Sequence, residues 1–202
     1  MSEKKDTTAN TLSFACLLLA ENPKKLQKVF EEIDSLKVVD KLDYDTLSKA
    51  VYINAVLMET LRLFPHASML QSRLTLTDCI IDDEIIIPSG IGILFDTWKI
   101  HHDPLYWRSD VNEFQPERHF SSNMLTDYFF PFGIGPRQCI GMRFALMEQK
   151  AVLIQFFKHF TVKLPEGITS KDLYISLRNT GTVWPKDLKL IIEKRTHFPN
   201  PA

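Results

Sequence analysis

A single cysteine lies in a glycine-rich loop that leads directly into a helical pattern. The segment FFPFGIGPRQCIGMRFALME runs from Phe129 to Glu148, and its cysteine is Cys139. Glycines and prolines keep the loop out of regular structure, and a helical pattern begins after Gly141. Any fold of this chain must therefore hold a reactive thiol beside the start of a helix.

The composition is that of an ordinary globular protein. The 202 residues are 45% hydrophobic and 24% charged, enough for one sizeable core or two small ones. The net charge of −1 argues against nucleic acid as a partner. Cys16, Cys79 and Cys139 are far apart and odd in number, which indicates reduced thiols and no disulfide framework. The longest apolar run, residues 14–20, is too short to span a bilayer.

The first part of the chain predicts helices. Residues 8–20 are apolar almost all round, which is typical of a buried helix. Asn22 as N-cap and Pro23 at the first helical position open a second helix, and its apolar residues fall on one face. A third helix starts with Asp43 or Asp45 as its cap and runs to about residue 63, where Pro65 ends it.

The rest of the chain mixes strands, a long loop and one more helix. Short strands are expected near residues 70–76, 79–81, 84–87 and 91–95, with Asp82 and Asp83 as a hairpin turn and one helical turn at 97–101. Residues 103–138 show little periodicity, as functional loops do. A helix follows over 141–160, and its core-facing residues are Phe144, Met147, Ala151, Ile154 and Phe157. Short strands then complete an α+β fold that is mainly helical.

The cysteine loop combines the groups that a haem bound through cysteine needs. The start of a helix offers free N–H groups and partial positive charge, which favour a thiolate at Cys139. Glycines let the backbone approach a flat ligand, Arg137 can pair with a carboxylate, and Phe132 supplies an apolar wall. Together these groups indicate haem on a cysteine. The alternative is an ordinary buried free cysteine in a glycine turn.

The spacing around Cys139 decides between these two interpretations. The sequence FGIGPRQCIG matches F-x-x-G-x-R-x-C-x-G at every fixed position, and these positions are Phe132, Gly135, Arg137, Cys139 and Gly141. The chain resembles the cytochrome P-450 superfamily of haem-thiolate monooxygenases. The resemblance implies haem b as cofactor, with Cys139 as the ligand of its iron. In the helix after the cysteine and in IHHDPLYW, the chain is most similar to the microsomal family-3 type.

A second family motif concerns structure and not catalysis. In ETLR, Glu59 and Arg62 lie three residues apart and share one helix face. By itself such a pair is usually a surface ion pair. The resemblance implies that it joins an arginine of a later P-E-R segment, here Arg118. We therefore expect a buried cluster of Glu59, Arg62 and Arg118 that braces the long loop.

The oxygen side of the haem is expected at the start of the chain. In the family, an acid and an alcohol on a helix above the haem relay protons, and Asp6 and Thr7 match that pair. An ordinary helix cap is the alternative for Asp6. The residues before it, EKK, depart from the family pattern of a small residue and a glycine.

Further contacts follow from the resemblance alone. Arg73 matches the arginine that pairs with a haem propionate together with Arg137. His101 and His102 match a family segment with a structural role. The residues expected on the substrate side are Ala67, Ser68, Met69, Leu70, Thr182 and Val183. Plain loop structure is the alternative for these two segments.

The resemblance runs from about residue 6 to about residue 193 and covers only the C-terminal part of the family fold. We therefore expect residues 1–202 to form a single partial domain, with the N-terminal part of the fold absent and little activity alone. The implied function is a monooxygenase that takes O₂ and electrons from an NADPH-dependent reductase and oxidises apolar small molecules. The resemblance implies the endoplasmic reticulum membrane as location; this chain shows no anchor, and so we expect it on the cytosolic side of that membrane, or soluble if it is truly truncated. Two alternatives are an inactive remnant and a haem-thiolate isomerase or lyase that needs no reductase.

Overall fold

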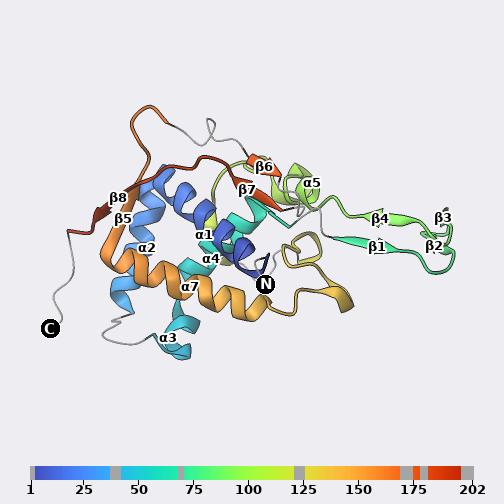
Figure 1. Cartoon of the computed structure of the whole chain (residues 1–202), viewed down its shortest axis with the longest axis horizontal. Coiled ribbons are helices and arrows are strands. Elements are labelled where there is room, and N and C mark those ends of the chain that lie inside the picture. The colour runs from blue at the N-terminus through green and yellow to red at the C-terminus, as the bar shows by residue number, and fades with distance from the viewer. Residues whose placement is uncertain are drawn as a thin grey trace.

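The computed structural model describes residues 3–36, 42–67, 71–120, 126–168, 175–177 and 182–196. Within them the chain is mainly helical with short antiparallel strands, which confirms the predicted α+β class. Long helices pack at one side, and a narrow arm of strands projects from the other (Figure 1). The helices are α1 (Glu3–Glu21), α2 (Pro23–Ser35), α3 (Tyr44–Lys49), α4 (Val51–Leu63), α5 (Thr97–His101), α6 (Pro104–Trp107) and α7 (Met142–His159), with 3₁₀ turns η2 (Pro116–Phe120), η3 (Thr126–Tyr128) and η4 (Gly135–Arg137).

Four of these helices enclose the core. Helix α1 is buried along most of its length, as its apolar sequence predicts, and α4 lies beside it. The predicted apolar face of α2 packs inward through Leu26, Val29 and Ile33. Helix α7 adds Ile154 and Phe157, both fully buried. The core therefore lies where α1, α2, α4 and α7 meet.

The first turns of α7 differ from the prediction. Phe144, expected to face the core, is 71% exposed, while Met147 and Ala151 are half-buried. Helix α7 begins where the chain leaves the cysteine loop, beyond the closely packed part of the bundle (Figure 1). Periodicity locates the helix but does not say how much of its length has a neighbour.

The helix predicted from residue 43 to 63 is in fact two helices. Asp43 caps α3 as expected, because its Oδ1 accepts the Thr46 N–H at 2.8 Å. At Ala50 the backbone leaves the helical region, with ψ at 79°. The carboxylate of Glu32 on α2 then accepts the N–H groups of Tyr52 at 2.6 Å and Ile53 at 2.8 Å. These bonds satisfy the free N–H groups of a new helix start, so α4 begins at Val51.

The boundary between α1 and α2 also differs in detail. Pro23 opens α2 as predicted, but the Asn22 side chain does not cap it. Instead the Asn22 Nδ2 donates to the carbonyl of Leu18 at 2.8 Å. Asn22 thus provides a hydrogen-bond partner for a carbonyl at the end of α1. The last carbonyls of a helix lack partners within the helix, as the first N–H groups do.

The strands form two-stranded antiparallel pairs. In the arm, β1 (Ser72–Leu74) pairs with β4 (Gly92–Leu94), and β2 (Cys79–Ile81) pairs with β3 (Ile85–Ile87). The predicted turn is confirmed, because Asp82 and Asp83 both take positive φ angles, 54° and 58°. The remaining pairs join β5 (Phe160–Lys163) to β8 (Ile191–Lys194) and β6 (Ile175–Leu177) to β7 (Val183–Pro185).

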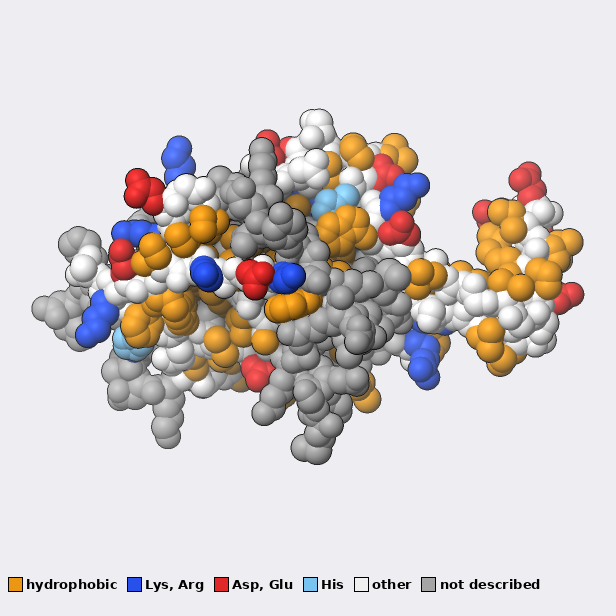
Figure 2. Space-filling view, turned by 45° about the horizontal axis from the view of Figure 1, so that its top comes forward, with side chains coloured by type: hydrophobic (Ala, Val, Ile, Leu, Met, Phe, Trp, Pro, Cys, Tyr) orange, Lys and Arg blue, Asp and Glu red, His pale blue; other side chains and the backbone are white. Residues whose placement is uncertain are grey.

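The arm carries hydrophobic side chains in the open (Figure 2). Ile80 and Ile86 face each other across β2 and β3 and are 66% and 67% exposed. No helix among the described residues is long and apolar enough to cross a membrane. The exposed apolar residues of this structure lie on strands and loops as well as on helices.

Candidate active site

The cysteine loop is a tight, hydrogen-bonded structure. The N–H of Gln138 donates to the carbonyl of Gly135 at 3.0 Å, and the N–H of Cys139 donates to the carbonyl of Phe132 at 2.9 Å. Gly133 and Gly135 take φ angles of 75° and 73°, a region that strains other residues. The glycines of the motif therefore fold the loop back on itself and bring Cys139 to the start of α7.

The thiol of Cys139 lies beside the open end of this helix. Its side chain is exposed, and Gly141, at the N-cap of α7, offers no side-chain cap. A Cβ placed on Gly141 would lie 4.0 Å from the Cys139 sulfur. The sulfur of Cys139 therefore lies close to the start of α7.

A cavity of about 280 Å³ opens in front of this sulfur. Its lining comes from α1, the cysteine loop, the first half of α7 and single residues of α4 and β1. The segment between α4 and β1 closes it at one side. The lining residues are Thr7, Thr8, Thr11, Leu61, His66, Ala67, Gln71, Arg73, Pro131, Phe132, Gly133, Arg137, Cys139, Ala145 and Gln149.

Two arginines reach the cavity from different elements. Arg73 lies in the middle of β1 opposite Ile93, and its guanidinium donates to the carbonyl of Ser72 at 2.8 Å. Arg137 is exposed at the end of η4. Both line the same cavity, which gives it two cations for an anionic ligand.

The residues present fit a haem. An exposed thiol, a glycine backbone and the Phe132 ring suit a flat apolar ligand with iron, and two arginines suit its two carboxylates. Gln149 adds an independent sign, since it is 2% exposed, lines the cavity and has no hydrogen-bond partner for its Oε1. A buried amide without a partner points to a polar group or water in the cavity.

The oxygen-side residues belong to α1. This helix begins at Glu3, earlier than the sequence predicted, so Asp6 and Thr7 are both helical. Thr7 lines the same cavity as the cysteine loop. The Asp6 side chain lies outside the described part of the structure.

Among the described residues predicted on the substrate side, only one is found in the lining of the cavity. Ala67 lines the cavity. Thr182 is buried, and Val183 packs against Phe14 and Leu17 of α1, away from the cavity wall. The other three, Ser68, Met69 and Leu70, lie outside the described residues.

Behind the cavity, the structure brings Glu59, Arg62 and Arg118 together. Arg62 donates to Glu59 from Nε and Nη2, both at 2.9 Å, and Arg118 Nε donates to Glu59 Oε1 at 2.9 Å. The side chains of Glu59 and Arg62 are fully buried. Arg62 also donates to the carbonyl of His101 at 2.8 Å. The cluster thus fastens α4, α5 and η2 to one another.

Sequence reasoning missed one member of this cluster. His119, directly after Arg118, places its Nε2 2.8 Å from Glu59 Oε2. Burial would raise the pKa of Glu59, but bonds from His119 and Arg62 bring it down to about 2. Burial lowers the pKa of His119, so its neutral ring donates to the carboxylate. The sequence signal for His119 was its place in the segment PERHF, directly after Arg118.

His101 and His102 lie away from the cavity and make structural contacts. The Nε2 of His101 accepts the N–H of Phe130 at 3.1 Å, which ties α5 to the start of the cysteine loop. Burial is the largest cause that lowers the pKa of His101, to about 3. The Nδ1 of His102 lies 2.9 Å from the carbonyl of Trp98. Their placement agrees with a structural role.

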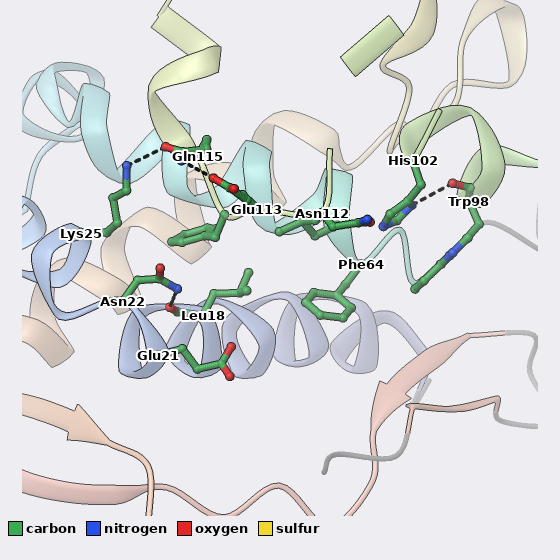
Figure 3. A pocket seen from close by; sticks show the side chains of 12 residues that line it. Leu18, Glu21, Asn22, Lys25, Phe64, Trp98, His102, Asn112, Glu113 and Gln115 are labelled. Carbon is green, nitrogen blue, oxygen red and sulfur yellow. Dashed lines mark hydrogen bonds between the residues drawn. The ribbon is translucent and has the colours of Figure 1, made fainter. Parts of the chain in front are cut away.

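A larger cavity of about 500 Å³ lies elsewhere, between α1, α4, α5 and the loop before η2 (Figure 3). Its polar side chains bind one another: Lys25 donates to Gln115 at 2.9 Å, and Gln115 donates to Glu113 at 2.9 Å. None of its lining residues comes from the cysteine loop. By size alone this cavity would be the candidate active site. The cysteine and the two arginines instead lie in the smaller cavity, which we therefore take as the candidate.

Comparisons with known proteins show which sequences this chain is similar to. A family model described as Cytochrome P450 matches residues 2–190. The chain is 40% identical to the putative cytochrome P450 CYP13A8 of Caenorhabditis elegans over 190 residues, and 40% identical to CYP13A7 of the same organism over 195. These matches cover 94% of this chain and 36% of each relative. Cytochrome P450 3A6 of Oryctolagus cuniculus is 43% identical over 163 residues, which cover 79% of this chain and 32% of that protein. The chain thus spans about 36% of the length of its curated relatives.

Proposed function

The chain belongs to the cytochrome P450 family, and on that premise we propose that it carries the cysteine side of a haem-thiolate monooxygenase. The carrying observation is that Cys139, Arg73 and Arg137 line one cavity together with three threonines of α1. A thiol and two cations around one space are the groups that hold haem b by its iron and its carboxylates.

Each residue has a distinct task in this proposal. Cys139 binds the iron as a thiolate, which the start of α7 favours. Arg73 and Arg137 pair with the haem carboxylates, and Gly135 and Gly141 let the backbone lie close to the ring. The bound haem supplies the activation of O₂ and its insertion into the substrate.

Protons are the task of α1. We assign Asp6 and Thr7 to proton delivery on the face of the cavity opposite Cys139. In support of this assignment, Thr7 lines the cavity, and a position on a helix holds it in one place better than a loop would. An acid next to a hydroxyl can pass protons over hydrogen-bond distance.

The partners follow from the family and the character of the cavity. An NADPH-dependent reductase would supply electrons, and bulky apolar small molecules would be the substrates, as the similarity to family-3 proteins suggests. The two segments that contain Ala67 and Thr182 would form the substrate side of the cavity. The endoplasmic reticulum membrane is the proposed location.

The test is product analysis with haem-loaded protein. Oxidised product should form from a bulky apolar substrate only when NADPH and a reductase are present. A rearranged product formed without reductase would show an isomerase or lyase and overturn the proposal. Failure to retain haem in a one-to-one ratio would also overturn it.

A further inference from the structure

Asn10 is a buried amide on α1 that holds β7 in place. Its side chain is 6% exposed, and its Nδ2 donates to the carbonyl of Val183 at 3.0 Å. The N–H of the same Val183 donates to the carbonyl of His66 at 2.8 Å. Both backbone groups of Val183 are therefore bound by segments far away in sequence, one by α1 and the other by the turn after α4.

The position of Asn10 is unusual for an amide. Asn10, Phe14 and Leu17 follow the i, i+4, i+7 spacing of one helix face, and Phe14 and Leu17 pack against Val183. A leucine at position 10 would extend this apolar stripe. A buried amide costs free energy unless it is hydrogen-bonded, so the bond to Val183 is what accounts for an asparagine there.

This three-way junction connects to the cavity. His66 is 6% exposed and lines the cavity beside Ala67, and its carbonyl is the one bound by Val183. On α1, Asn10 lies three residues after Thr7 and one before Thr11, which both line the cavity. The rings of Phe14 and Phe64 stack at 4.3 Å and join α1 to the same turn. A shift of β7 would therefore move a wall of the cavity.

We propose that Asn10 is a positioning residue for substrate recognition: through Val183 it fixes the turn at His66, and so the shape of the cavity wall that meets an apolar substrate. The proposal rests on the proposed function for the nature of the ligand. It concerns the lining residues of α1 and of the turn at His66, which β7 contacts through Val183, while Cys139, Arg73 and Arg137 belong to other elements of the lining. Changes at Asn10 should consequently affect substrate binding and leave haem binding intact.

The first test does not depend on haem. Asn10→Asp keeps the shape without an amide donor, and Asn10→Leu extends the apolar stripe. Both should speed exchange of the Val183 amide hydrogen by about tenfold, as expected for loss of one buried hydrogen bond. Ser13→Ala is the matched control, since the Ser13 hydroxyl bonds only within α1, to Ala9 at 2.8 Å. Unchanged exchange at Val183 in both Asn10 variants would overturn the proposal.

The second test measures recognition in haem-loaded protein. Nile Red, a fluorescent apolar probe, should bind about fivefold more weakly to both Asn10 variants than to the wild type or Ser13→Ala. The ferrous carbonyl spectrum should keep its position. Unchanged Nile Red affinity despite faster Val183 exchange would show a purely structural role and overturn the proposal. A wild-type carbonyl band without thiolate character would instead count against the proposed function, and the exchange test would still decide on Asn10.

Discussion

The three cysteines differ in what surrounds their sulfur atoms. Cys16 lies within α1, and burial raises its pKa to about 12, so it stays a neutral thiol. Cys79 is exposed on the arm, where its thiol lies 3.5 Å from the carbonyl of Thr77. Cys139 alone of the three combines exposure with a helix start and a cavity that holds two arginines. These surroundings distinguish Cys139 from the other two cysteines as the candidate iron ligand.

Replacement of Cys139 tests its assignment as iron ligand. The ferrous carbonyl complex of haem-loaded protein should show the red-shifted band of thiolate ligation. Cys139→Ser should lose this band because a hydroxyl is a much weaker electron donor to iron. Cys79→Ser is the matched control and should keep it. An unchanged carbonyl spectrum in Cys139→Ser would contradict the assignment.

Glu59 is the residue whose charge holds the buried cluster together. Glu59→Gln keeps the shape but leaves Arg62 and Arg118 without their carboxylate. The variant should lose roughly 3–5 kcal/mol of unfolding free energy, the usual cost of breaking a buried ion pair. Urea denaturation would measure it.

The control for this variant is an exposed ion pair. Lys28 pairs with Glu117 at 2.6 Å, and the Lys28 side chain is 49% exposed. Lys28→Ala should cost only about 0–1 kcal/mol. Equal losses in the two variants would show that burial does not set the strength of the Glu59 cluster.

Single residues were predictable where a motif names them. The spacing around Cys139 and the E-x-x-R pair were readable in the sequence. For His119 the sequence offered only its place next to Arg118, and for Gln149 it offered no signal, because neither side chain's direction can be read from the sequence. The direction is fixed only when α4, η2 and α7 pack.

At the scale of elements, the boundaries depend on neighbours that are distant in sequence. The pattern from residue 43 to 63 predicted one helix, since no glycine or proline interrupts it. The break at Ala50 coincides with two bonds from Glu32, twenty residues earlier. Local signals such as the cap at Asp43 and the turn at Asp82 were read correctly, because their partners are adjacent in sequence.

Removal of the Glu32 carboxylate tests this explanation of the helix break. Glu32→Ala should lower the unfolding free energy by about 1–2 kcal/mol, as loss of a helix cap does. Glu31→Ala is the control, because Glu31 is exposed and bonds only to Gln27 on the surface, at 3.3 Å. Thermal or urea unfolding would compare them. Equal stability of the two variants would mean that Glu32 does not determine where α4 begins.

At the scale of the whole molecule, apolar surface lies open around the site. Ile134 is 56% exposed, Phe144 is 71% exposed, and Ile140 has no cover at all. The class of the fold followed from the order of helices and strands. The exposure of these side chains did not follow from the sequence, because periodicity shows which residues are apolar but not which of them pack against a neighbour.

These open surfaces predict weak catalysis by residues 1–202 on their own. In the proposed function, the cysteine loop and α1 would hold haem and substrate beside these exposed side chains, and small misplacements reduce rates on the order of a hundredfold. Turnover per bound haem, measured with reductase and NADPH, should therefore fall far below that of a full-length relative. Comparable coupled turnover would show that the exposed surfaces do not matter for catalysis.

Four buried or half-buried histidines predict how the stability of the molecule depends on pH. Burial lowers the pKa values of His66, His101, His102 and His119 below the value of about 6.5 that they have in the unfolded chain. As the pH falls below about 6.5, the unfolded state binds protons before the folded state does, so the unfolding free energy decreases. Urea denaturation between pH 7.5 and pH 5 should show this loss. A repeat in about 1 M salt is the control, because salt screens surface charges but not burial. Constant stability over this range would contradict neutral buried histidines.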